Sequence, residues 1–155
     1  MRLGKKLLSL CMVMILAFAV VACGGGEKKK TVTLTMEQNG VSLDYVMEAK
    51  GDKVTSIKQI SYIDCSVYSD EEVEYLMEML DEYSATYAAY DCVDYSTKIQ
   101  GDDLVETISI DTTDIDEVKA LSAAGLVPID TTNASFISLE KTIESLKSIG
   151  MTEKK

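Results

Sequence analysis

Carboxylates are the side chains whose number and spacing offer the most chemistry in this sequence. The chain carries 26 Asp and Glu against 15 Lys and Arg, and Lys98 is the one basic residue between Asp64 and Glu117. Four glutamates in this stretch recur at helical spacing, opposite an apolar stripe: Glu71, Glu74, Glu78 and Glu82. Such an acidic helix face keeps an exposed protein soluble, and it can also dock a basic protein or hold cations diffusely. Both interpretations stay open at this point.

Two more specific uses of carboxylates are disfavoured. Residues 111–117 are rich in acids, but they lack the spacing and the turn glycine of an EF-hand calcium loop. Asp114, Asp116 and Glu117 instead suit the start of a helix, whose free N–H groups favour carboxylates. Carboxylate pairs that hydrolyse glycosidic bonds usually lie in deep aromatic clefts, and this small chain has no Trp. We therefore expect no metal, no cofactor and no catalytic residue.

Thiols and tyrosines offer two further candidate sites. Cys65 and Cys92 form no Cys-x-x-Cys pair and have no basic neighbours, which disfavours a redox role. They flank a predicted helix of roughly 28 Å, so separate thiols are favoured over a disulfide, although a helix that ended early would permit the bridge. Tyr68, Tyr87 and Tyr90 could form a platform for a sugar or a peptide, whereas the edge of the core is the ordinary place for tyrosine.

The beginning of the chain has the layout of an export signal. A basic start precedes an apolar run over residues 7–21, which is too short for a membrane span of roughly 20 apolar residues. Val20, Val21 and Ala22 then stand directly before Cys23. This arrangement resembles the bacterial lipobox, in which a lipid is joined to the cysteine by a thioether and the preceding chain is removed. Cys23 is therefore predicted to be lipidated, with cleavage after Ala22.

Three segments follow from this motif. Residues 1–22 are predicted to be a lipoprotein signal peptide, residues 23–30 a lipidated cysteine with a flexible tether, and residues 31–155 a single domain. The lipid on Cys23 would hold the domain to the cell membrane on its extracytoplasmic side, or facing the periplasm if the organism has an outer membrane. A formal net charge of -11 argues against nucleic acid as a partner, because phosphate binding needs a basic surface.

Alternating apolar and polar residues predict the strands that would build this domain. Five runs show the alternation: residues 31–36, 41–49, 53–65, 93–100 and 104–111. Asn39-Gly40 between the first two is the dipeptide most typical of a tight hairpin, and Gly101-Asp102 joins the last two. The third run slips out of alternation near Ile57, which predicts a bulge or a bend.

Three segments with helical spacing complete the predicted fold: residues 70–88, 114–124 and 138–149. The longest begins with a capping box formed by Ser69 and Glu72, and its apolar stripe includes Leu76, Met77 and Leu80. The element order is thus β-β-β-α-β-β-α-α. This order predicts an α+β fold, a mainly antiparallel sheet with helices packed on one face.

Several turns, caps and core positions also match a known pattern: Cys23, Glu-Gln-Asn-Gly-Val at 37–41, Gly-Asp-Lys-Val at 51–54, Ser-Leu-Glu-Lys at 138–141, Leu146 and Gly150. With these residues the mature chain resembles the YehR-like family of small bacterial lipoproteins. The resemblance implies a secreted domain with helices on an antiparallel sheet, and a function that is not established. It carries over no functional residue beyond Cys23.

The sequence therefore predicts a non-enzymatic, lipid-anchored envelope protein that binds a partner or a small ligand. The predicted anchor, the single small domain and the lack of a catalytic set favour this interpretation. A structural spacer in the envelope is the alternative, and a small thiol or carboxylate enzyme is a third hypothesis.

Overall fold

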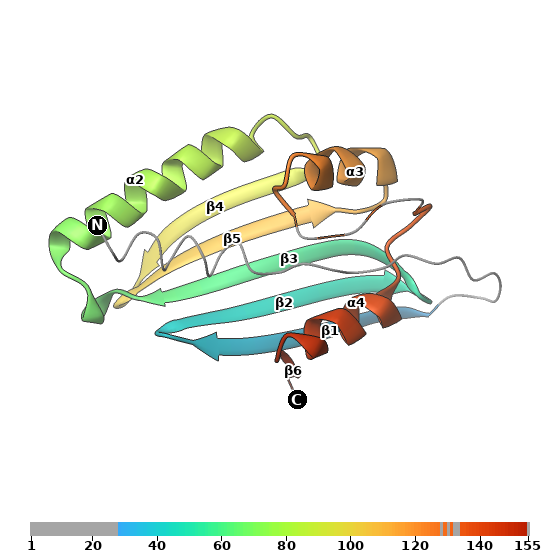
Figure 1. Ribbon diagram of the computed structural model, residues 1–155, viewed down its shortest axis with the longest axis horizontal. Helices are drawn as coiled ribbons and strands as arrows, with labels where there is room; N and C mark the ends of the chain where they lie inside the picture. Colours follow the sequence, from blue (N-terminus) through green and yellow to red (C-terminus); the bar gives the residue numbers. More distant parts are fainter. Residues whose placement is uncertain (1–27, 128, 130, 132–133, 155) are drawn as a thin grey trace.

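The computed structural model describes residues 28–127, 129, 131 and 134–154, and Figure 1 shows how their elements are arranged. The predicted signal peptide and Cys23 lie outside the described residues, so lipidation stays a prediction. Among the helices that the structure describes, none combines the length and the apolar character needed to cross a membrane.

The described strands form one sheet in the order β4-β5-β3-β2-β1-β6, and every pairing is antiparallel. The strands are β1 (Lys29–Gln38), β2 (Val41–Lys50), β3 (Lys53–Asp64), β4 (Val93–Gln100), β5 (Asp103–Asp111) and β6 (Thr152–Glu153). Strand β1 begins inside the predicted tether, because Lys29 pairs with Lys50 on β2. Strand β6 was not predicted, since its 2 residues are too few to show an alternation.

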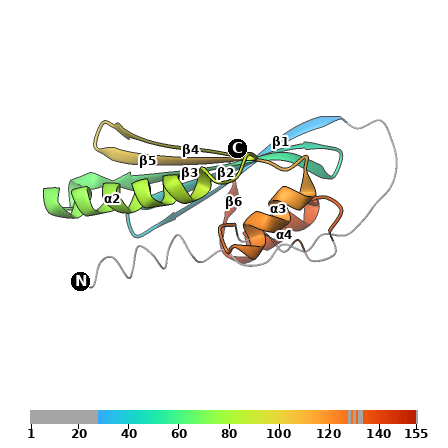
Figure 2. The ribbon, with the colours of Figure 1, turned by 90° about the horizontal axis from the view of Figure 1, so that it is seen from above.

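Three α-helices of the described chain lie on the same side of this sheet, as Figure 2 shows. They are α2 (Asp70–Tyr87), α3 (Ile115–Ala123) and α4 (Leu139–Ser148), and a short 3-10 turn, η1 (Cys65–Val67), precedes α2. Helix α2 begins with the predicted capping box, in which the Glu72 carboxylate accepts a hydrogen bond from the Ser69 backbone N–H at 2.9 Å. The predicted α+β fold and element order are confirmed.

The predicted irregularity in the third strand is a β-bulge. Glu48 pairs with Ser56, but the next β2 residue pairs with Val54, so Thr55 is the extra residue. The bulge lies two positions before Ile57, where the alternation slips. It lets both Val54 and Ile57 point to the helix-covered side, where the two side chains are buried.

Two apolar clusters fill the space between the helices and the sheet. The larger cluster lies under α3 and α4 and extends to the end of α2; its most buried members include Leu34, Met47, Val118 and Leu121. The smaller cluster lies under α2 and contains Ile63, Leu76, Leu80 and Leu104. Leu76 and Leu80 thus face the sheet as predicted. The prediction was wrong for Met77, which is 45% exposed because each successive residue turns about 100° around a helix.

Candidate binding groove

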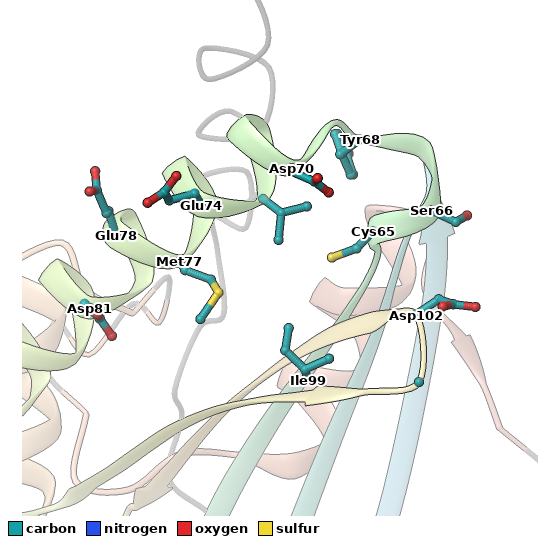
Figure 3. Close-up of a pocket in the computed structure, with 12 residues that line it drawn as sticks. Cys65, Ser66, Tyr68, Asp70, Glu74, Met77, Glu78, Asp81, Ile99 and Asp102 are labelled. Carbon is teal, nitrogen blue, oxygen red and sulfur yellow. The ribbon is translucent and has the colours of Figure 1, made fainter.

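A groove of about 680 Å³ runs between α2 and the β4–β5 hairpin (Figure 3). Five of its lining residues are acidic: Asp70, Glu74, Glu78, Asp81 and Asp102. None of the described lining residues is basic. The groove therefore offers a strongly negative rim to a ligand.

The rim follows from the spacing of acidic residues along α2. Asp70, Glu74 and Glu78 are four residues apart and Asp81 follows three residues later, so the four carboxylates run along one side of the helix. Only part of the predicted acidic face of the helix borders the groove. Its members Glu74 and Glu78 line the groove, whereas Glu71 and Glu82 are exposed elsewhere on the helix.

The floor of the groove is apolar. Met77 of α2 and Ile99 of β4 point toward one another in Figure 3, and they are 45% and 54% exposed. Val73 and Tyr68, which are half-buried, extend this surface toward the start of the helix. Scattered exposed apolar side chains are common, but these two face one another inside a groove, where they offer an apolar surface to a ligand.

The two cysteines of the described chain lie at opposite ends of β5. Cys65 lines the groove, and its backbone N–H donates to Asp102 at 2.8 Å, whereas the Cys92 carbonyl accepts from Asp111 at 2.8 Å. The 9 residues of β5 span about 30 Å, so no disulfide can form, and the prediction of separate thiols is confirmed. Burial, with a smaller contribution from Glu117, raises the pKa of Cys92 to about 11, which makes it a poor nucleophile.

The three tyrosines that were considered as a platform do not come together. Tyr68 lies before α2 and Tyr87 ends it, and the 18 residues of α2 span about 27 Å. Tyr87 is buried, donates to the Leu126 carbonyl at 2.8 Å and stacks on Tyr95 with ring centroids 5.4 Å apart. The platform hypothesis was wrong, because the ring of Tyr87 belongs to the core.

The acidic segment at 111–117 is occupied by local contacts. The Asp111 carboxylate accepts from Thr113 N–H at 2.8 Å, Asp114 caps α3 by accepting from Asp116 N–H at 3.0 Å, and Asp116 pairs with Lys119 at 3.1 Å. Within the described ranges, no group of three or more potential ligands is placed to hold a metal ion. Asp114, Asp116 and Glu117 therefore lie at the start of α3, as the sequence predicted, and Asp111 holds the turn before it.

Glu106 is a buried carboxylate that the sequence analysis missed. It is 5% exposed on the helix-covered side of β5, between Leu104 of the smaller cluster and Ile108 of the larger one. Its carboxylate accepts from the Tyr95 hydroxyl at 2.8 Å and from the Ser61 hydroxyl at 3.2 Å. Burial raises the pKa of Glu106, and the two hydrogen bonds oppose that rise in part.

The signal for this buried position was present in the sequence. Leu104, Ile108 and Ile110 alternate on one face of β5, and residue 106 must share that face. Glu106 does not line the groove. We therefore assign it to the stability of the fold, and the groove remains the candidate functional site.

An antiparallel sheet with helices on one face is the fold that the resemblance to small YehR-like lipoproteins implied. The chain belongs to the family described as a protein of unknown function, DUF1307, which matches residues 30–152. The family resemblance predicted from the sequence is thereby confirmed.

Relatives with similar sequences span the whole chain. The uncharacterized lipoprotein Lmo0207 of Listeria monocytogenes is 32% identical over 161 residues, which cover 99% of this chain and 98% of the relative. The uncharacterized lipoprotein Lin0239 of Listeria innocua is 31% identical over 156 residues, with the same coverage of 99% and 98%. Both names support the interpretation of the chain as a lipoprotein.

Two solved structures share the fold at low sequence identity. The NMR structure of Escherichia coli YehR is 19% identical with a TM-score of 0.61, and the match covers 83% of this chain and 93% of that one. An NMR structure of a protein from Streptococcus pneumoniae TIGR4 is 18% identical with a TM-score of 0.59, covering 90% and 93%. These similarities concern the fold alone.

Proposed function

We propose that this lipoprotein is a non-enzymatic binding protein of the bacterial cell envelope, and that its groove holds a basic segment of a partner protein. The observation that carries the proposal is the acidic rim around the exposed pair Met77 and Ile99. Anchoring through a lipid on Cys23, on the extracytoplasmic side of the membrane, is part of the proposal. The export signal and the similarity to named lipoproteins support it.

The arrangement of the carboxylates favours a peptide over a metal ion. Asp70, Glu74 and Glu78 are about 6 Å apart along α2, because four helical residues rise about 1.5 Å each. Glu74 and Glu78 project outward from the helix in Figure 3 and do not converge on one point. Flexible Lys or Arg side chains can reach each carboxylate separately, whereas a single cation cannot contact several of them at once.

Binding of a basic segment would also relieve repulsion within the rim. Like charges at positions i and i+4 of a helix destabilise it by roughly 0.2–0.5 kcal/mol per pair, and Glu74 and Glu78 are such a pair. An aliphatic side chain between the basic residues of the segment would cover Met77 and Ile99 and remove apolar surface from water. Charge and apolar contact thus favour the same kind of segment.

A binding experiment with two matched variants tests this proposal. The full chain in nanodiscs is titrated with a blocked synthetic peptide of the sequence Thr-Lys-Thr-Leu-Thr-Lys-Thr. The double variant Glu74→Gln, Glu78→Gln should bind about twofold to thirtyfold more weakly, since exposed ion pairs contribute about 0.2–1 kcal/mol each. The control Glu71→Gln, Glu82→Gln removes the same charge from the same helix but not from the groove, and it should bind like the parent.

The spacer hypothesis makes the opposite prediction. A protein that only fills space in the envelope has no reason to distinguish the two double variants. Equal affinities for the peptide in both variants, or no binding to the parent chain, would contradict the proposed binding role.

A further inference from the structure

Strand β4 forms one edge of the sheet, and its outer side pairs with no other strand in the described part of the chain. Residues 96–100, the last five of its 8 residues, are exposed. Ile99, one of these five, also lines the groove beside α2. The free edge of the sheet, which is β4 in Figure 1, therefore meets the acidic groove of Figure 3 at Ile99.

The backbone groups of β4 alternate between its inner and its outer side. Asp111 N–H donates to the Cys92 carbonyl at 2.8 Å, so residue 92 bonds toward β5. Val93 N–H instead donates to a carbonyl outside the sheet at 3.1 Å. Because the alternation repeats every two residues, the N–H and C=O groups of Thr97 and Ile99 point to the outer edge. Their side chains point to the helix-covered side, opposite residues 106 and 104 of β5.

We propose that the partner segment binds as an added β-strand along the outer edge of β4, with every second side chain in the groove. This inference rests on the proposed function and specifies how the same partner would be held. Hydrogen bonds to the backbone of Thr97 and Ile99 would supply affinity, and the alternate side chains would supply specificity.

The dimensions of a strand fit those of the rim. Side chains at positions i and i+4 of a strand are about 13 Å apart. Glu74 and Asp81 are separated by seven residues, or about 11 Å, along α2. A segment with basic residues at i and i+4 and an aliphatic residue at i+2 would therefore place its charges near Glu74 and Asp81, with the aliphatic side chain over Met77 and Ile99.

Charge argues for a basic partner and against a second copy of this chain. If two copies paired through antiparallel β4 strands, their α2 helices would lie on the same face of the joined sheet, on either side of the seam. The acidic rims would then face each other, in a chain whose formal net charge is -11. Lys98 does not offset this repulsion, because it points to the opposite face of the sheet.

Methylated peptides test the strand directly. The full chain in nanodiscs of phosphatidylcholine, which lack the anionic lipids that attract basic peptides, is titrated with the same heptapeptide. One version carries an N-methyl group on the central Leu, and another carries it on the preceding Thr. Neighbouring residues of a strand direct their N–H groups to opposite edges, so only one methyl group interrupts the bonds to β4. We expect the two versions to differ in affinity by about tenfold or more.

A second measurement uses the protein side of the same contact. Proline is tolerated on an edge strand where its missing N–H faces outward, so Thr97→Pro removes a bond to the added strand and leaves the β4–β5 ladder intact. It should weaken binding of the unmethylated peptide about tenfold, whereas Thr97→Val, which keeps the N–H, should not. If Thr97→Pro fails to fold, the methylated pair decides alone.

The outcomes separate the two proposals. In one outcome, the double variant Glu74→Gln, Glu78→Gln binds the peptide more weakly while the parent binds both methylated peptides equally well. That result would support the groove as the binding site and overturn the added strand. A parent chain that does not bind the peptide overturns both proposals. Self-association of the chain that is lost in Thr97→Pro would assign the edge to a second copy and overturn the inferred partner.

Discussion

Replacing Glu106 with Gln should change how the free energy of unfolding depends on pH. Glu106 is 5% exposed, and burial raises its pKa above the usual 4.5 even though Tyr95 and Ser61 donate hydrogen bonds to the carboxylate. Gln has nearly the same shape and retains an oxygen that can accept these bonds, but it does not titrate. The substitution therefore removes the titration and preserves most of the packing.

The sign of the effect follows from the direction of the shift. The folded protein keeps a proton on Glu106 to a higher pH than the unfolded chain does. The stability that this proton contributes is complete below the unfolded pKa near 4.5, and it is lost as the pH rises through the folded pKa. Between the two values, unfolding releases one proton, so the free energy of unfolding falls by up to about 1.4 kcal/mol per pH unit.

Comparison with the parent isolates this contribution. Three other carboxylates have pKa values lowered by hydrogen bonds, and they make stability fall toward low pH instead: Asp64, Glu72 and Asp111. Both proteins share them, so they cancel in the difference. As the pH rises, the stability of Glu106→Gln relative to the parent should therefore increase.

Urea unfolding followed by far-UV circular dichroism between about pH 4 and about pH 8 measures the effect. Tyr95→Phe serves as a second variant, because it removes a hydrogen bond that lowers the pKa of Glu106 and should extend the fall in stability to a higher pH. A constant difference between Glu106→Gln and the parent over the whole range would refute the reasoning from burial.

Three further predictions concern the anchor, helix α2 and the thiols. Cys23→Ala should leave the chain uncleaved or release it from the membrane fraction, and normal size with normal retention would contradict lipidation. Leu76→Ala should lower the free energy of unfolding by about 2–5 kcal/mol in a urea melt, because Leu76 is 3% exposed. Met77→Ala, at a side chain that is 45% exposed, should cost less than about 1 kcal/mol, and equal losses would refute the orientation of α2. Titration of free thiols in the denatured, unreduced mature chain should detect both Cys65 and Cys92. If neither thiol is detected, the two cysteines form a disulfide.

The sequence alone determined the five long strands, the three α-helices and their order, because the signals for them lie in neighbouring residues. Asn39 and Gly40 adopt φ values of 55° and 79°, the positive values that a two-residue hairpin requires. Ser69 and Glu72 form their capping box within one helical turn. Alternation and helical spacing then indicate which face of each element is apolar, and this sufficed for the α+β fold.

Only the tertiary structure decided which side chains are exposed and which of them lie close together. Met77 matched the apolar stripe of a helix and Ile99 the alternation of a strand, and neither pattern shows that the two side chains face one another in a groove. That outcome depends on where α2 crosses the sheet, which is set by Leu76 and Leu80 packing on Ile63 and Leu104.

The burial of Glu106 and the separation of the cysteines have the same origin. Glu106 is buried because Leu104 and Ile108, which share its face of β5, belong to clusters that helices cover. Cys65 and Cys92 are apart because the pairing of β5 places them at its two ends. Local sequence fixes the conformation of each element, whereas these contacts join residues far apart along the chain, and their geometry exists only once the helices have packed on the sheet.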